Sequence, residues 1–334
     1  MQTRENALHQ WLKTIYTQFD YHLTPLTGDA SFRRYYRLQH ENTSRIVMDA
    51  PPDKLSLTPF MHICSLLSTR GLITPQIYAS DDTLGFILLE DFGDVLFRDV
   101  IHHDNHQQLY KTALSLLHQM HAPPKPTIKL APFDQAFMLQ ELALFHDWFL
   151  TRHLGLTLSP SEHQLLAQTF QTLTADIANQ PNVLIHRDYH SRNIMVLPST
   201  DTSSPKLGII DFQDAMLGPI TYDVVSLLKD CYVQLSSDEI MSQLQQFHAH
   251  SKVAQSYPFD VFQKAFDWCG LQRHLKVLGI FCRLHLRDGK PHYLNDLPRT
   301  YDYVTHCLRG YPEFSVFSEW LQDRIDPVFQ RKRS

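Results

Sequence analysis

The sequence contains no long apolar run, and no segment approaches the roughly 20 consecutive apolar residues that a membrane-spanning helix needs. Its first residues also lack the continuous apolar stretch of a secretory signal peptide. Basic residues are not in excess, because 30 lysines and arginines face 35 aspartates and glutamates. The chain therefore has no basic field to attract nucleic acid. These absences predict a cytoplasmic protein that binds neither membranes nor nucleic acid.

Cysteine is scarce, and no two cysteines form a Cys-x-x-Cys pair. The five cysteines are odd in number and widely spaced, a pattern typical of reduced, buried thiols in a cytoplasmic protein. Histidine is abundant, with 20 residues, but pairs such as His118 and His121 have no third candidate ligand near them in the sequence. We therefore do not expect a zinc site.

A length of 334 residues with 43% apolar residues allows two domains or one two-lobed enzyme with a large core. The first 90 residues contain short segments in which apolar and polar positions alternate, which indicates strands. We therefore expect a small β-rich lobe with a turn at 28–31. Its expected elements are helices over 8–19 and 59–70 and strands over 22–27, 32–38, 45–48, 76–79 and 86–90.

From residue 91 onward, apolar residues recur mostly at helical spacing. No internal repeat or long linker interrupts the chain, so we expect an α+β protein whose two lobes share a rigid hinge. The expected elements are helices over 109–120, 137–150, 224–235 and 268–282, and a hairpin of strands 194–197 and 207–210 with its loop at 198–206.

The segment VLIHRDYHSRNIMV, residues 183–196, places a polar stretch between two apolar tripeptides. Asn193 ends this stretch, and Asp211 directly follows the second strand of the predicted hairpin, so both side chains can converge on one cation. An amide and a carboxylate oxygen suit Mg²⁺, which takes few protein ligands. Asp188 is then placed to accept a proton from an attacking hydroxyl, as phosphoryl transfer requires.

Each of these residues also has an ordinary structural interpretation. Asp188 and Asn193 could be turn residues and Asp211 could cap a helix, so only their combined spacing supports catalysis. We expect His186 and His190 to brace the polar loop by hydrogen bonding rather than to act as catalysts or ligands.

The motif HRDYHSRN at 186–193, followed by IDF at 210–212, resembles the aminoglycoside phosphotransferase and choline kinase branch of the protein-kinase-like fold. The segment GPITYD at 218–223 resembles the part of that branch in which an aspartate, here Asp223, supports the catalytic loop. This resemblance implies a bilobal protein-kinase-like fold. Its parts would be an N-lobe over 1–90, a hinge over 91–95 and a mainly helical C-lobe over 96–334.

Six segments in the same order resemble the N-acetylmuramate/N-acetylglucosamine anomeric kinases of bacterial cell-wall recycling. The resemblance implies an ATP-dependent, Mg²⁺-requiring kinase that phosphorylates the anomeric hydroxyl of a small amino sugar in peptidoglycan recycling. The segments are GDASFRRYYRL (28–38), MDAPP (48–52), FILLEDFGD (86–94), HRDYHSRN (186–193), IDFQDAMLGPITYDVVSLLKDCY (210–232) and FDWCGLQRHLKVLGIFCRLHLRDGK (266–290).

The resemblance also implies a role for each site residue. Asp188 would be the catalytic base, with Asn193 beside it, and Asn193 and Asp211 would ligate Mg²⁺. Backbone N–H groups of the 28–31 turn would cover the ATP phosphates, and the 90–91 segment would lie at the hinge that holds adenine. The implied ATP site comprises Gly28, Asp29, Ser31, Arg33, Arg34, Glu90 and Asp91.

One feature departs from the kinase pattern. Kinases of this fold carry a lysine on the third strand to hold the phosphates, but here that strand reads RIVMD at 45–49. Arg33 and Arg34 are the nearest replacement cations, and Lys54 is a weaker one. Because a strand alternates its side chains between two faces, only one of the two arginines faces the phosphates. We favour Arg34.

Two other functions stay open. A kinase for a cationic molecule such as an aminoglycoside or choline needs carboxylates in the C-terminal helices, but residues 267–290 carry five basic against two acidic residues. A catalytically inactive nucleotide-binding module is suggested by the missing lysine, but Asp188, Asn193 and Asp211 are all present. The sequence leaves open the preferred sugar, the anomer and the oligomeric state.

Overall fold

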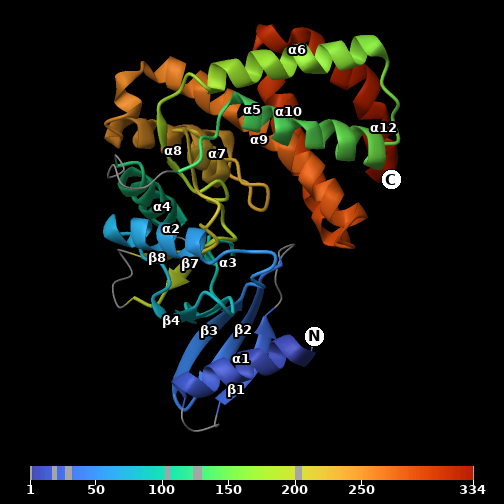
Figure 1. The fold of residues 1–334 in the computed structure, drawn as a ribbon. Helices are drawn as coiled ribbons and strands as arrows, with labels where there is room; N and C mark the ends of the chain where they lie inside the picture. The colour runs from blue at the N-terminus through green and yellow to red at the C-terminus, as the bar shows by residue number, and fades with distance from the viewer. Residues whose placement is uncertain are drawn as a thin grey trace. The chain divides into compact units, whose positions relative to one another are not determined.

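The computed structural model describes residues 2–16, 21–26, 32–101, 106–122, 130–199 and 205–333. The chain forms two compact units, one of Met1–Val100 with Ile194–Asp214 and one of Ile101–Asn193 with Ala215–Ser334. The first is built on an antiparallel sheet and the second mostly on helices (Figure 1). The protein is therefore α+β, as predicted. The two units are called the sheet unit and the helical unit below.

The sheet unit contains five antiparallel strands in the order β1-β2-β3-β5-β4. Helix α1 covers one face of the sheet (Figure 1). The elements are α1 (Gln2–Ile15), β1 (Tyr21–Leu26), β2 (Arg34–His40), β3 (Thr43–Asp49), α2 (Thr58–Thr69), β4 (Ile77–Asp81), β5 (Phe86–Glu90) and α3 (Phe97–Val100). The core between α1 and the sheet consists of Leu8, Trp11, Leu12, Leu38, Val47, Phe86 and Leu88.

The hairpin predicted from the sequence belongs to the sheet unit. It attaches through a parallel bridge between Gly208 and Ile73. A side chain at Gly208 would come within 2.6 Å of the Phe92 ring, so this close approach requires glycine. After the hairpin, Phe212 packs on Phe60 of α2, with 5.0 Å between ring centroids. The hairpin strands are β7 (Ile194–Leu197) and β8 (Lys206–Ile209).

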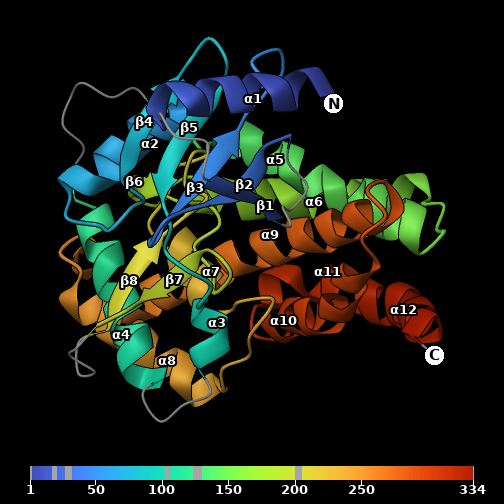
Figure 2. The same ribbon diagram turned by 90° about the horizontal axis from the view of Figure 1, so that it is seen from below.

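Helix α9 (Phe259–Leu286) runs through the helical unit, with α5 and α10 packed alongside it (Figure 2). Its middle is buried on all sides, which normally demands an apolar sequence. Yet α9 also buries Gln272, Arg273, His274 and Lys276, each at most 4% exposed. Buried polar groups of this kind need partners inside the protein, and these partners lie around the candidate active site.

The remaining elements of the helical unit surround α9. Its two strands, β6 and β9, form an antiparallel pair. The longer elements are α4 (His106–Met120), α5 (Gln135–Leu144), the π-helix η1 (Phe145–His153), α6 (Pro160–Ile177), β6 (Asn182–Ile185), β9 (Met216–Pro219), α7 (Tyr222–Leu228), α8 (Ser237–His250), α10 (Leu297–Arg309), α11 (Ser315–Trp320) and α12 (Asp326–Arg333).

The predicted sheet strands, the hairpin strands and most predicted helices are confirmed, with some ends shifted by a few residues. The helix predicted over 224–235 is wrong in its second half, because α7 ends at Leu228. The Asp230 carboxylate instead accepts the backbone N–H groups of Ser191 and Tyr232, both at 2.8 Å, which holds this stretch out of helical form. The predicted helix over 137–150 continues as the π-helix η1.

We predicted an N-lobe over 1–90, a hinge over 91–95 and a C-lobe over 96–334. The two compact units have other bounds, and the predicted division stays a prediction. The sheet unit continues to Val100 and includes the β7–β8 hairpin. All five cysteines are buried and free, as predicted. None of the described helices is long and apolar enough to cross a membrane. The turn at 28–31 and the hairpin tip at 200–204 lie outside the described residues.

Candidate active site

Residues 186–193, the catalytic loop of the prediction, follow β6 in the helical unit. The buried carboxylate of Asp223 accepts the backbone N–H groups of His186 at 2.6 Å and of Arg187 at 3.0 Å. Arg187 adopts a left-handed backbone conformation with φ of 77°, which such hydrogen bonds can stabilise. Burial raises the pKa of Asp223 to about 6, and His186 opposes this rise. Asp223 therefore supports the loop, as predicted.

Hydrogen bonds within the loop bring Asp188 and Asn193 together. The Asn193 side-chain nitrogen donates to the Asp188 carbonyl oxygen at 3.0 Å, and the His190 backbone N–H donates to the same oxygen at 3.0 Å. Because an amide nitrogen can only donate, the Asn193 side-chain oxygen is the atom that can bind a cation. The loop thus holds a carboxylate and an amide oxygen donor a few residues apart.

Asp188 lies among buried positive charges. Burial alone raises the pKa of its carboxyl, but Lys276, Arg273 and Arg187 outweigh this effect and lower the pKa to about 2. Asp188 is therefore ionised at neutral pH. It can accept a hydrogen bond from a substrate hydroxyl and orient that hydroxyl for attack.

Sequence analysis missed Glu141 of α5, which is only 9% exposed. Its carboxylate accepts hydrogen bonds from Arg187 at 3.0 Å and from Gln272 at 3.2 Å, and Lys276 lies 3.4 Å away. Lys276 also donates to the Tyr222 hydroxyl at 2.8 Å. A glutamate within the apolar stretch of residues 136–145 was the available signal. Glu141 holds in place Arg187 and Lys276, two of the cations that act on Asp188.

The two loop histidines differ in their contacts. The His186 ring nitrogen Nδ1 accepts the backbone N–H of Asp188 at 3.3 Å, as expected for a bracing residue. The His190 ring packs edge-on against Tyr232, with 5.1 Å between centroids. Burial lowers the pKa of His190 to about 4, so the ring is neutral at pH 7.

Asp211 lies in the sheet unit, just after β8, with a left-handed backbone φ of 63°. Its carboxylate accepts a hydrogen bond from Gln213 at 2.8 Å. Burial and the negative charge of Asp211 raise the pKa of Tyr35 on β2. Tyr35 therefore lies on the sheet face nearer to Asp211. A carboxylate is the kind of oxygen donor that Mg²⁺ prefers.

The two candidate arginines have different surroundings. Arg34 forms an ion pair with Asp49 at 2.9 Å, and Arg4 of α1 bonds the same carboxylate at 2.6 Å. Arg33 directly precedes β2, and its positive charge opposes the rise in the pKa of Tyr35, so Arg33 lies near Tyr35. The stated preference for Arg34 does not suit this geometry, since Arg34 lies on the α1 side. Lys54 is exposed and lies 3.5 Å from Asp53.

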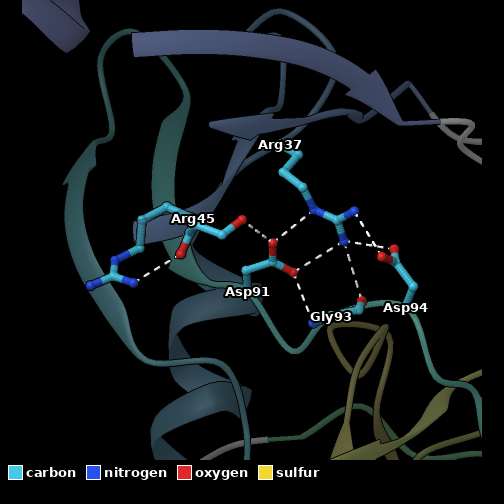
Figure 3. Close-up of polar contacts among 6 residues, drawn as sticks. Arg37, Arg45, Asp91, Gly93 and Asp94 are labelled. Carbon is cyan, nitrogen blue, oxygen red and sulfur yellow. Dashed lines mark hydrogen bonds and ion pairs between the residues drawn. The ribbon is translucent and has the colours of Figure 1, made fainter. Parts of the chain in front are cut away.

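The predicted hinge residues make well-defined contacts in the sheet unit. Arg37 donates two hydrogen bonds to Asp91, at 2.7 and 3.2 Å, and two to Asp94, at 2.7 and 3.0 Å (Figure 3). The Glu90 backbone N–H donates to Gln76 at 2.8 Å. Burial raises the pKa of Asp91, but hydrogen bonds from Ser44 and Arg37 reverse this and lower it. The Asp91 side chain also accepts the backbone N–H of Gly93 at 2.9 Å, so it fixes the backbone of the predicted hinge.

Three predicted nucleotide-site residues, Gly28, Asp29 and Ser31, lie outside the described residues. The structure brings Asp188 and Asn193 together in the helical unit. In the sheet unit, the charges of Arg33 and Asp211 both act on Tyr35, and Arg34 forms an ion pair with Asp49. Asp91 and Glu90 follow one another at the end of β5.

The chain is similar to known proteins over most of its length. The sequence model of a family described as "Phosphotransferase enzyme family" matches residues 22–257. An N-acetylmuramate/N-acetylglucosamine kinase of Neisseria meningitidis serogroup B is 36% identical over 96% of each chain. A protein of the same name from Pseudomonas aeruginosa is 39% identical over 90% of this chain and 87% of its own.

Solved structures share the fold at low sequence identity. Choline kinase LicA from Streptococcus pneumoniae has a TM-score of 0.62 at 15% identity and covers 90% of this chain and 99% of its own. The ADP-bound aminoglycoside phosphotransferase APH(2'')-Ib has a TM-score of 0.61 at 12% identity and covers 89% of this chain and 97% of its own. The bilobal kinase-like fold is thereby confirmed.

Proposed function

Because the chain belongs to the phosphotransferase enzyme family, we propose that it transfers the γ-phosphoryl group of ATP to the anomeric hydroxyl of N-acetylmuramate and N-acetylglucosamine. The observation that carries this proposal is the setting of Asp188, an ionised carboxylate held by its loop among buried cations. The names of the relatives, at 36% and 39% identity, support the choice of sugars.

Asp188 accepts the hydrogen bond of the C1 hydroxyl and takes its proton as that oxygen attacks the γ-phosphorus. The bond from the γ-phosphorus to the β–γ bridging oxygen breaks, and ADP leaves with that oxygen. A carboxylate with a pKa of about 2 is a weak base. An anomeric hydroxyl is more acidic than an ordinary alcohol, so it places a smaller demand on the base. In phosphoryl transfer the protein acts mainly by positioning and charge stabilisation. The fixed orientation of Asp188 is therefore its main contribution.

Asn193 and Asp211 are the proposed protein ligands of Mg²⁺, through their side-chain oxygens. The ion neutralises phosphate charge when bound. Asp211 also holds Gln213, which limits the freedom of its carboxylate. We propose Arg33 as the residue that binds the phosphates of ATP, because Arg34 is bound to Asp49 on the α1 side of the sheet.

The proposed nucleotide site further includes the backbone of the 28–31 turn and the hinge at Glu90 and Asp91. The Arg37 contacts with Asp91 and Asp94 keep the hinge backbone in one conformation. Such preorganisation lowers the cost of ordering the chain when adenine binds. We place the activity in the cytoplasm, in peptidoglycan recycling, because both sugars are components of that polymer.

The charges of the helical unit are less compatible with a kinase that acts on cationic molecules. The buried Lys276 and Arg273 and the partly buried Arg187 act electrostatically on Asp188, and Glu141 already accepts bonds from its own partners. These positive charges repel a cationic acceptor such as an aminoglycoside or choline. An inactive nucleotide-binding module would not require an ionised, oriented Asp188.

The test is ADP release from Mg-ATP with a panel of acceptors. We expect little turnover without a sugar and strong stimulation by N-acetylmuramate and N-acetylglucosamine. Stimulation by choline or an aminoglycoside alone would overturn the choice of substrate. Binding of Mg-ATP without turnover on any member of the panel would favour the inactive module.

A further inference from the structure

The imidazole ring of His190 forms no hydrogen bond with any residue that the structure describes. Its Nδ1 atom is buried without a partner. Its Nε2 atom also has no partner among the described residues, but it keeps access to solvent. His186 differs, because its Nδ1 accepts the backbone N–H of Asp188 at 3.3 Å. The expectation that both histidines brace the loop by hydrogen bonding is therefore met by the ring of His186 and not by that of His190.

The surrounding structure nevertheless holds the His190 side chain in one place. The His190 backbone N–H donates to the Asp188 carbonyl at 3.0 Å, and the His190 carbonyl accepts the backbone N–H of Asn193 at 2.9 Å. The ring packs edge-on against Tyr232, with 5.1 Å between centroids, and the residue is only 9% exposed. A side chain that is already fixed loses little conformational freedom when it binds a ligand.

The ring lies close to the proposed base. His190 and the Asp188 carboxyl each act electrostatically on the pKa of the other, so the two side chains are near neighbours. The Asp230 carboxylate also acts on the ring. Its oxygens, however, accept the backbone N–H groups of Ser191 and Tyr232. His190 therefore brings an unused nitrogen, Nε2, into the neighbourhood of Asp188.

The two ring nitrogens differ in what they can do. Burial lowers the pKa of His190 to about 4, and a neutral imidazole has one N–H donor and one bare acceptor nitrogen. A buried donor without an acceptor is rarer in proteins than a buried acceptor without a donor. This favours the form in which the buried Nδ1 is bare and Nε2 carries the hydrogen. Nε2 can then donate a hydrogen bond to a ligand oxygen.

We infer that His190 is a specificity-determining residue, whose Nε2 donates a hydrogen bond to the carbonyl oxygen of the C2 acetamido group of the acceptor sugar. This inference rests on the proposed function, in which the C1 hydroxyl lies at Asp188. C1 has two neighbours in the sugar ring, C2 and the ring oxygen. An amide carbonyl on C2 is a stronger acceptor than a ring oxygen, and N-acetylmuramate and N-acetylglucosamine both carry it.

The inferred contact would distinguish acetamido sugars from simple hexoses. Glucose carries a hydroxyl at C2, which is shorter than an acetamido group and leaves Nε2 of His190 unpaired. A site built to hydrogen-bond one group of its substrate rejects an analogue that lacks this group, because polar atoms of the site then lose their partner.

The experiment compares kcat/KM for N-acetylglucosamine and for glucose in wild type and in His190→Phe. Phenylalanine keeps an aromatic ring beside Tyr232 and removes both nitrogens. We expect kcat/KM for N-acetylglucosamine to fall about tenfold or more, since one partner of a hydrogen bond is lost. For glucose we expect a fall of less than about threefold. The loss should appear mainly in KM, because the contact binds the sugar and does not take part in proton transfer.

Two amide variants identify the nitrogen that acts. The side-chain nitrogen of His190→Gln can take the place of Nε2, whereas that of His190→Asn lies near the place of Nδ1. We expect His190→Gln to keep most of the preference for N-acetylglucosamine and His190→Asn to lose it. Neither variant has an aromatic ring, so a role in packing alone would affect both equally. Melting temperatures check that each variant is folded.

His250→Asn is the matched control. His250 is an exposed residue of α8, and its ring bonds the Gln246 carbonyl at 2.7 Å. This variant should leave kcat/KM for both sugars as in wild type.

The outcomes separate the inference from the proposed function. If wild type phosphorylates no acetamido sugar, the proposed function fails and the inference fails with it. If wild type is active but uses glucose as well as N-acetylglucosamine, or if His190→Phe keeps the wild-type preference, only the inference is overturned. Equal kcat/KM for N-acetylglucosamine in His190→Gln and His190→Asn would also overturn it. This last comparison needs no glucose turnover, so it decides the inference even where glucose is not a substrate.

Discussion

Arginines in the sheet unit bond directly to the carboxylates that they stabilise, whereas Lys276 in the helical unit bonds Tyr222 and Glu141 and acts on Asp188 through space. In the sheet unit, Asp49 and Asp91 are both largely buried, with side chains 2% and 6% exposed. Their arginines join separate parts of that unit, such as α1 to β3. In the helical unit, the cations keep a partly exposed carboxylate ionised.

The difference shows that buried charge has two uses in this chain. Where a carboxylate is bonded on both oxygens, as Asp91 is by Arg37, it fixes the backbone and is not available to substrate. Where a carboxylate is stabilised at a distance, its oxygens can meet a ligand. This distinction supports the proposed role of Asp188 as a reacting group and of the Asp91 side chain as a structural one. The predictions below test it.

Asp188→Asn should cause the largest change. The amide cannot take the proton of the acceptor hydroxyl, and general-base catalysis typically contributes about 10²–10⁴-fold. We expect kcat to fall by that factor, while the affinity for Mg-ATP, measured by titration calorimetry, stays close to wild type. If the variant keeps more than about a tenth of the wild-type kcat, Asp188 is not the base.

Asp211→Ala should abolish the Mg²⁺-dependent part of nucleotide affinity, because it removes the anionic ligand proposed for the metal. Titration with ATP in the presence and absence of Mg²⁺ measures this difference. Asp214→Ala is a matched control in the same segment. Equal affinity and turnover in wild type and Asp211→Ala would place the metal elsewhere.

The two neighbouring arginines should respond differently. Arg33→Ala should raise the KM for ATP severalfold, since an arginine can bind two phosphate oxygens at once. Arg34→Ala should instead lower the melting temperature, because it breaks the contact with buried Asp49, with less change in KM. Lys54→Ala should change neither quantity. A rise in KM for Arg34→Ala but not for Arg33→Ala would reverse this assignment.

Acid should destabilise the helical unit through its buried histidines. Burial lowers the pKa of His274 to about 3 and that of His190 to about 4, below the usual value near 6.5. The unfolded chain therefore binds protons that the folded chain does not, so stability is fully present above pH 6.5 and is lost as the pH falls toward 4.

Urea unfolding between pH 7.5 and 5 measures this loss. His274→Gln should make stability depend less on pH, whereas His22→Gln, at an exposed position of β1, should leave the dependence as in wild type. An identical pH dependence in His274→Gln and wild type would show that His274 does not contribute.

Much of the fold was predictable because local patterns agree with tertiary structure. Strand alternation predicted β2, β3 and β5, and the polar segment between apolar tripeptides predicted the catalytic loop. The 224–235 helix failed because the Asp230 side chain bonds to the backbone of Ser191, which is distant in sequence. A pattern of apolar residues carries no information about such a bond.

The sequence predicted the site residues that lie close together in the sequence. It did not predict the charged contacts between residues that are far apart in the sequence. Asp188 and Asn193 lie five residues apart, and their contact is local. Glu141 and Lys276 are separated by 135 residues in the sequence, and only the packing of α5 on α9 brings them together. The surroundings of Arg33 and Arg34 could not be predicted from the sequence. They depend on the register of β2 against β3, which pairs Arg34 with Asp49.

The position of the new phosphate tests the central claim most directly. Phosphorus and proton NMR of the product made from N-acetylmuramate and ATP will show which carbon bears the phosphate. The account predicts a phosphate coupled to the anomeric proton, loss of the sugar's reducing end, and almost no product from Asp188→Asn. A phosphate on C6 with an intact reducing end, or equal product from Asp188→Asn, would contradict it.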